Sequence, residues 1–235
     1  WQIQPKLPTI ASQMTKTFKN VFKVNASLLG ASRTDSGVHA IGQIVSCKTE
    51  LAITTSQIKN AWNNSLPKSI MIRSIEKIPN GKFNPFNNVE QKTYLYHLFL
   101  NRPLPLISRF GWFWKFVDQV DIIKFEKALQ LFVGTHDFRS FVKLEEDKGT
   151  IKTIDSIIVC KRSSIDAIQI IVKGKSFLRF QIRRMIGAAL DVARYKNMPL
   201  GKIQDMLRNP SPQQETTKAE GSGLCLYNVR YKHND

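Results

Sequence analysis

Apolar residues recur at two different spacings along this chain, and the spacings predict a mixture of helices and strands. Ile10, Met14 and Phe18 fall on one side of a helix that Thr9 is placed to cap. A later Thr-Thr-Ser-Gln sequence has the form of a capping box at the start of a second helix. The predicted helices span residues 9–22, 54–65, 121–133, 176–195 and 199–208.

Short apolar or alternating runs between these helices predict strands. The predicted strands span residues 24–29, 41–48, 70–78, 92–100, 150–162, 167–173 and 224–232. Segment 101–108 contains two prolines, interrupts this order and is the best candidate for a domain boundary. We therefore expect an α+β fold of two halves, residues 1–102 and 103–235, each an antiparallel or mixed sheet with helices on one face.

The charge balance narrows the possible functions. The 235 residues include 35 Lys and Arg against 18 Asp and Glu, a net charge of +17, which favours a polyanionic partner such as nucleic acid. A basic soluble protein without such a partner is the alternative. A hydrophobic content of 42% excludes a disordered tail protein, and no apolar run reaches the roughly 18 residues of a membrane helix.

The chain shows no sign of an export signal or of a disulfide framework. Its first residues lack a charged segment followed by an apolar one. Cys47, Cys160 and Cys225 are far apart, with neither disulfide nor metal-ligand spacing. We therefore expect a cytoplasmic protein in a reducing compartment.

Asp35 is the most informative candidate for chemistry, because it is the only acidic residue among the first 49. A lone carboxylate on a surface that binds phosphates needs a reason. One reason is catalysis, as a nucleophile or general base that nearby cations keep ionised. The other is structural, since Thr34-Asp35-Ser36-Gly37 is also good turn chemistry.

The sequence from Ala31 to Ala40, Ala-Ser-Arg-Thr-Asp-Ser-Gly-Val-His-Ala, resembles the signature of the TruA family of tRNA pseudouridine synthases. Ser32 and Ser36 depart from it, because the family more often has Gly at the first position and Ala or Lys at the second. Further segments resemble family motifs in the family's order: Trp1-Gln2-x-Gln4, Lys92–Tyr96, Gly134–Phe141, Phe177–Gly187, Ala219-Glu220-Gly221 and Gly223-Leu224.

The resemblance implies an enzyme that isomerises uridine to pseudouridine in the anticodon stem-loop of tRNA, around positions 38 to 40. It also implies a homodimer, and two similar α+β halves with a cleft between them. The reaction exchanges a C1′–N1 bond for a C1′–C5 bond without gain or loss of atoms or electrons, so no cofactor or metal is expected. The rivals are a non-catalytic RNA-binding protein or tRNA chaperone on the same fold, and a related synthase acting on another RNA.

The resemblance assigns roles to four residues. Asp35 would be the catalytic carboxylate, by attack on C1′, attack on C6 or removal of a ribose proton. Arg183 would pair with Asp35, whereas spacing alone also allows a solvated basic helix face with Arg179 and Arg184. Tyr94 would stack on the flipped uracil, whereas a strand tyrosine is more often part of a core. Arg33 would fill the space left by the flipped base or bind phosphate.

Two further residues are expected to shape the site without reacting. Gly187 lies four residues after Arg183, so both share a helix face, and a glycine there would let that face approach the catalytic loop closely. His39 has no partner visible in the sequence, and we interpret it as structural to the loop.

Overall fold

The computed structural model describes residues 1–78, 83–145 and 149–232, and the chain forms two compact units. The first unit contains Trp1–Thr34 and Gln43–Asn88, and the second contains Asp35–Gly42 and Val89–Asp235. These units do not coincide with the predicted halves 1–102 and 103–235, because strand β4 (Val89–Phe99) pairs with strands from the end of the chain. The α+β class is confirmed, whereas the similarity of two halves and a cleft between them stay predictions.

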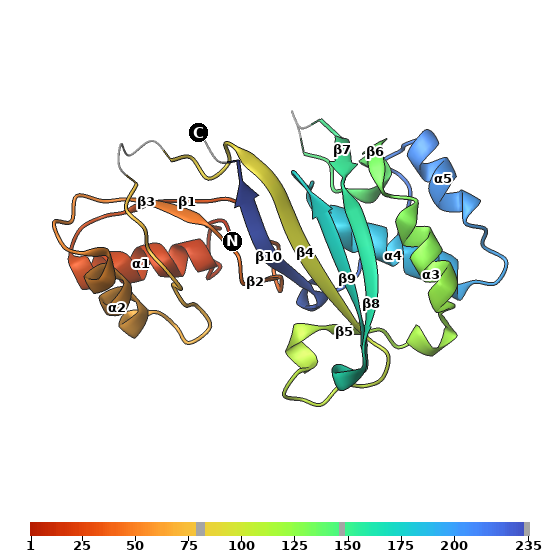
Figure 1. The fold of residues 1–235 in the computed structure, drawn as a ribbon, viewed down its shortest axis with the longest axis horizontal. Coiled ribbons are helices and arrows are strands. Elements are labelled where there is room, and N and C mark those ends of the chain that lie inside the picture. The colour runs from red at the N-terminus through yellow and green to blue at the C-terminus, as the bar shows by residue number, and fades with distance from the viewer. Residues whose placement is uncertain (79–82, 146–148, 233–235) are drawn as a thin grey trace. The chain divides into compact units, whose positions relative to one another are not determined.

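The N-terminal unit consists of helices α1 (Ile10–Phe22) and α2 (Thr55–Ser65) and the antiparallel strands β1 (Ser27–Gly30) and β3 (Val45–Lys48) (Figure 1). Both helices begin with capping boxes, of which the one at Thr54 was predicted, whereas at Thr9 only a cap was predicted. Thr9 accepts a hydrogen bond from the Ser12 amide, and Thr54 accepts one from the Gln57 amide. These local contacts satisfy amides that a helix leaves free at its start, so they fix where each helix begins.

The core of this unit lies between its two helices. Phe18 of α1 and Trp62 of α2 meet edge to face, with their ring centroids 4.8 Å apart, and Met14 and Leu66 complete the buried cluster. The Trp62 indole nitrogen donates a hydrogen bond to the Met14 carbonyl at 3.2 Å. This partner allows the polar edge of a buried tryptophan to leave water.

The prediction of a strand at 70–78 is wrong, because this segment packs along the core of the unit and does not pair with another strand. Ile70 and Ile72 pack against the cluster around Phe18. The Asn63 side chain donates to the Ile72 carbonyl at 2.9 Å and accepts from the Ile72 amide at 2.8 Å. One amide side chain thus supplies the hydrogen bonds that a neighbouring strand would have made.

The C-terminal unit is built on a six-stranded mixed sheet. Five strands lie in the order β2-β10-β4-β9-β8, and the short β5 pairs with β4. The β2–β10 and β4–β5 pairs are parallel and the other pairs are antiparallel (Figure 1). Besides β4, the strands are β2 (His39–Ala40), β5 (Trp112–Phe113), β8 (Ser156–Arg162), β9 (Ala167–Gly174) and β10 (Leu224–Tyr231).

Three helices accompany this sheet: α3 (Ile122–Gln130), α4 (Gln181–Arg194) and α5 (Gly201–Arg208). Helix α4 packs against both α3 and α5 and is buried along most of its length. The remaining elements are a second antiparallel pair, β6 (Gly134–Asp137) and β7 (Ile151–Ile154), and short 3₁₀ turns at Ser108–Phe110, Val117–Gln119, Arg139–Phe141, Ser163–Ile165 and Gly221–Gly223. No helix in the described part of the chain is long and apolar enough to span a membrane.

Two predicted elements in this unit change their bounds for identifiable reasons. The predicted strand 150–162 divides at Asp155, since β7 pairs with β6 whereas β8 joins the large sheet beside β9. The predicted helix 176–195 begins only at Gln181, because Phe180 has a left-handed backbone, with φ of 65°. This second change places the start of α4 next to the candidate site.

Candidate active site

The Asp35 loop is a tight turn at the start of the C-terminal unit. The Val38 amide donates to the Asp35 carbonyl at 3.2 Å. Gly37 has φ of 78°, a backbone conformation that residues with a Cβ rarely adopt. The predicted turn therefore exists, and it leaves the Asp35 side chain free for a second role. After the turn, β2 pairs with β10 and ties the loop to the sheet.

The 3₁₀ turn Gly221–Gly223 packs closely behind this loop. A Cβ at Gly221 would lie 2.6 Å from the Ser36 carbonyl oxygen, which is closer than a Cβ and a backbone oxygen can approach. Only a glycine allows this contact. The close packing fixes the backbone beside Asp35 to the segment that precedes β10.

Arg183 is the buried partner of Asp35. It lies in the first turn of α4, and its Nη1 is 3.3 Å from Asp35 Oδ2. The Arg183 side chain is 8% exposed and that of Asp35 is 20% exposed. The pairing predicted for these two residues is present, and Arg183 does not lie on a solvated basic face.

A second hydrogen bond orients the Arg183 guanidinium. Its Nε donates to the Ala219 carbonyl at 2.7 Å, while the Ala219 amide donates to the Arg183 carbonyl at 3.1 Å. Segment 217–219 therefore runs against α4. A Cβ at Gly187 would lie 1.7 Å from the Thr217 carbonyl oxygen. The glycine therefore allows segment 217–219 to approach α4 closely, whereas the Asp35 loop had been predicted in that position.

Two tyrosines of β4 lie on one face of the sheet, because they are two residues apart. Tyr96 is fully buried, and its hydroxyl donates to the Glu220 carbonyl at 3.0 Å. Burial raises the pKa of the Tyr96 phenol well above its ordinary value of 10.0, and the nearby charge of Arg183 only partly opposes this shift. The Tyr96 hydroxyl is therefore a protonated donor that supports the segment next to Arg183.

Tyr94 lies one strand repeat, roughly 7 Å, from Tyr96 along β4. Tyr94 is 6% exposed, and its ring meets Phe177 edge to face with centroids 5.1 Å apart. The structure thus shows Tyr94 packed on the same sheet face as the residues around Arg183. Its role toward a base stays a prediction.

Cations gather around the half-buried ring of Phe180, the residue before α4. Lys218 Nζ lies 4.6 Å from the ring centroid, and the guanidinium carbons of Arg179 and Arg183 lie at 5.0 and 5.3 Å. Arg183 is paired with Asp35, and Arg179 lies 4.0 Å from Glu145, so Lys218 supplies most of the net positive charge beside the pair.

The two other residues from the signature occupy different positions. His39 begins β2, and its Nε2 lies 2.7 Å from the Arg109 carbonyl oxygen, with its ring tilted against Phe110. This hydrogen bond supports the interpretation of His39 as structural. Arg33 is exposed and belongs to the N-terminal unit, whereas Asp35, Tyr94 and Arg183 belong to the C-terminal unit.

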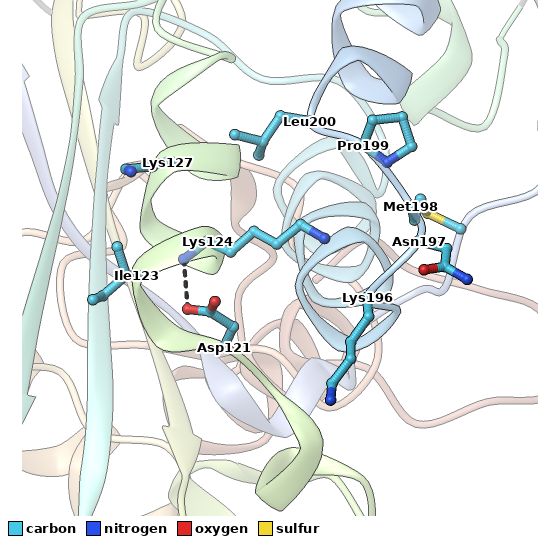
Figure 2. A pocket seen from close by; sticks show the side chains of 9 residues that line it. All are labelled: Asp121, Ile123, Lys124, Lys127, Lys196, Asn197, Met198, Pro199 and Leu200. Atoms are coloured by element: carbon cyan, nitrogen blue, oxygen red, sulfur yellow. Dashed lines mark hydrogen bonds between the residues drawn. The ribbon is translucent and has the colours of Figure 1, made fainter.

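A surface pocket of about 460 Å³ lies between α3 and the α4–α5 connection, as Figure 2 shows. It is lined by Asp121, Ile123, Lys124, Lys127, Lys196, Asn197, Met198, Pro199 and Leu200. The Asp121 carboxylate accepts a hydrogen bond from the Lys124 amide at 2.9 Å, which caps α3. None of the predicted site residues lines this pocket, so it is separate from the candidate active site.

Comparison with known proteins gives consistent results. Residues 128–232 match the family model described as tRNA pseudouridine synthase. The chain is 32% identical to tRNA pseudouridine synthase A 1 of Bacillus cereus, over 99% of this chain and 93% of that protein. It is 32% identical to tRNA pseudouridine synthase A of Fervidobacterium nodosum and 29% identical to that of Thermodesulfovibrio yellowstonii. Each of these matches covers 98% of this chain and 93% of the relative.

The chain belongs to the tRNA pseudouridine synthase A family. Members of this family isomerise uridine to pseudouridine. The region matched by the family model includes Arg183 and Ala219, whereas the match to the relatives extends over nearly the whole chain, Asp35 and Tyr94 included.

Within this member of the family, sequence reasoning did not identify two contributors to the site. Tyr96 lies two residues after Tyr94 on one strand, and this alternation, which places both side chains on one face, is the signal that could have identified it. Ala219 contributes a backbone carbonyl, which any residue carries. No side-chain pattern could therefore have shown that this carbonyl accepts a hydrogen bond from Arg183.

Proposed function

We propose that this chain isomerises uridine to pseudouridine in the anticodon stem-loop of tRNA, around positions 38 to 40, with Asp35 as the catalytic carboxylate. The observation that carries the proposal is the asymmetric burial of the Asp35–Arg183 pair. Arg183 is enclosed and held by Ala219, whereas the Asp35 carboxylate keeps an exposed edge. A carboxylate held in this way has a fixed position and is able to reach a nucleotide.

This arrangement fits the chemistry of the reaction. The C1′–N1 bond must break and a C1′–C5 bond must form, so negative charge near C1′ stabilises the positive charge that develops there, as in glycoside hydrolysis. Attack on C1′, attack on C6 and removal of a ribose proton all require an ionised carboxylate. Arg183 would compensate the negative charge of Asp35 without occupying its exposed edge.

The substrate must reach Asp35 as an extruded base. We propose that Tyr94 stacks on the flipped uracil and that Arg33 fills the vacated position in the RNA stack or binds phosphate. Lys218 and Arg179, which flank Phe180, would contact the phosphate backbone near the target nucleotide. The net charge of +17 would supply most of the affinity for tRNA.

The proposal extends to assembly and location. We propose a homodimer in the cytoplasm, in which one tRNA contacts both subunits. The homodimer and its contact with tRNA follow from the family resemblance, and the cytoplasmic location follows from the cysteine usage.

The test compares the wild-type protein with Asp35→Asn on purified tRNA and maps pseudouridine at each uridine. Asparagine keeps the turn but lacks the charge, so we expect no product at positions 38 to 40 and tRNA affinity within a few-fold of the wild type. Near-normal product from Asp35→Asn would exclude the catalytic assignment. Tight tRNA binding with no product from the wild-type protein would instead favour the RNA-binding rival, and product in a different RNA would favour a related synthase.

A further inference from the structure

The direction in which Arg183 points depends on a backbone carbonyl. Its Nε hydrogen bond to Ala219, at 2.7 Å, is shorter than its 3.3 Å contact with Asp35. A guanidinium is a rigid planar fork, so fixing one nitrogen fixes the others. Whatever fixes Ala219 therefore controls how Arg183 meets Asp35.

Segment 217–219 is attached to α4 at three points on one helix face. Arg183, Gly187 and Asp191 are spaced four residues apart, so they follow one another along that face over about 12 Å. Arg183 contacts Ala219 at one end, and Gly187 leaves room for the Thr217 backbone. Asp191 contacts Thr217 at the other end.

The Asp191 contact uses both carboxylate oxygens. Oδ2 accepts from the Thr217 backbone amide at 3.0 Å, and Oδ1 accepts from the Thr217 hydroxyl at 2.7 Å. Two hydrogen bonds from one residue fix both the position and the rotation of its backbone. Hydrogen bonds to an ionised acceptor are also stronger than those between neutral groups.

We propose that Asp191 is a positioning residue for the reaction: by fixing Thr217 it sets the Ala219 carbonyl, and through that carbonyl the contact of Arg183 with Asp35. The inference rests on the proposed role of Asp35 and Arg183. In this role the Asp191 side chain does not contact RNA. Loss of the Asp191 carboxylate would therefore slow the reaction without weakening substrate binding.

The experiment measures the single-turnover rate and the tRNA affinity of the full chain for three substitutions. Asp191→Asn keeps the shape but can accept through only one atom, and Thr217→Val removes the hydroxyl. We expect both to be slower than the wild type by about 10- to 100-fold, the scale of a displacement of about 1 Å in an active site, with tRNA affinity within about two-fold. Thr217→Ser keeps the hydroxyl and should be slowed by less than about three-fold.

Asp121→Ala is the matched control. Asp121 also accepts a hydrogen bond from a backbone amide through its carboxylate, at the start of α3 (Figure 2). Its contact with α4 is made by its own backbone amide, which donates to the Ala193 carbonyl and is kept in the Ala variant. Loss of the Asp121 carboxylate should lower the thermal unfolding temperature and leave the single-turnover rate unchanged at temperatures where the protein is folded. This separates a general loss of stability from a loss of positioning.

A double-mutant cycle with Arg183→Lys tests whether Asp191 acts on the single-turnover rate through Arg183. A purely structural role of Asp191 would give the same loss of rate in both backgrounds. Lysine cannot donate to Ala219 and Asp35 through one rigid fork, so Asp191→Asn should slow Arg183→Lys far less than it slows the wild type. A full, independent loss in both backgrounds would overturn the inference, as would a wild-type rate for Asp191→Asn or a parallel loss of affinity. If Asp35→Asn is inactive while Asp191→Asn is normal, only the positioning role fails; an active Asp35→Asn would remove the proposed function itself.

Discussion

Arg183 and Asp35 are 148 residues apart in the sequence, yet Arg183 Nη1 lies 3.3 Å from Asp35 Oδ2. The arginine is the more buried of the two, and its position is fixed by the Ala219 carbonyl. The ion pair thus has one rigid member and one member with an edge open to solvent. This asymmetry suits a carboxylate that must reach a substrate.

Replacing Arg183 by Met should abolish most catalysis while leaving tRNA binding nearly intact. Methionine keeps the length of the stem but removes the charge, so the Asp35 carboxylate loses its partner. We expect the single-turnover rate to fall by orders of magnitude, measured together with tRNA affinity across salt concentrations. Arg230→Met is the control, because Arg230 forms an exposed ion pair with Glu90 that contributes about 1 kcal/mol or less. A flattened salt dependence for Arg183→Met would show that Arg183 is a phosphate contact instead.

Tyr94→Leu should slow the reaction by roughly 10- to 100-fold, in keeping with the 1–3 kcal/mol that stacking on one base is worth. Leucine keeps apolar bulk but removes the planar ring. Tyr94→Phe keeps the ring that also packs against Phe177, and should stay closer to the wild type if stacking dominates. The measurements are single-turnover rate and thermal unfolding. A lowered unfolding temperature with an unchanged rate would mean that Tyr94 is only a core residue.

Gly187→Ala should destabilise the protein by about 1–3 kcal/mol, the usual cost of overfilling a packed interior, and should also slow the reaction. The added Cβ would lie 1.7 Å from the Thr217 carbonyl oxygen, so the backbone of segment 217–219 must move. Gly201→Ala is the control, because a Cβ there meets nothing within 4 Å. Denaturant unfolding and single-turnover rates of both variants test this, and a neutral Gly187→Ala would contradict the close packing.

Stability should decrease as the pH falls below 6.5, partly because of His97. Burial lowers the pKa of His97 from its ordinary value of 6.5, and the charge of Arg162 lowers it further, against an opposing backbone hydrogen bond with Phe110. Below pH 6.5 the unfolded chain binds a proton at His97 before the folded chain does, so acid favours unfolding. The contribution of neutral His97 to the free energy of unfolding is fully present above pH 6.5, and it is lost as the pH falls from there through the folded-state pKa of His97.

The variant His97→Gln isolates this effect. Glutamine does not titrate and can still accept a hydrogen bond from Gln169, whose Nε2 lies 2.7 Å from His97 Nε2. Thermal unfolding at pH 7 and pH 5 should show a smaller acid-induced loss in His97→Gln than in the wild type. Equal losses in the two proteins would mean that other groups carry the whole acid dependence.

The sequence by itself determined the features that depend on neighbouring residues. Thr9 and Thr54 cap helices through atoms three residues away, so the starts of α1 and α2 were predictable. The Asp35 turn was also predictable from Thr34-Asp35-Ser36-Gly37. The ordered motifs identified the family, and the comparisons confirm it.

Only the tertiary structure decided the features that depend on distant partners. The apolar segment 70–78 is no strand, because Asn63 supplies the hydrogen bonds of Ile72. The predicted strand 150–162 divides at Asp155, because its two parts find partners in different sheets.

The candidate site follows the same rule. Residue spacing left Arg183 either solvated or paired, and the resemblance favoured pairing. Its hydrogen bond to Ala219 and the contact of Asp191 with Thr217 could not be predicted, because each joins a helix to a segment with no periodic pattern. Such contacts form where the folded chain brings backbone groups within about 3 Å of a side chain, and a backbone amide or carbonyl leaves no trace in the residue types.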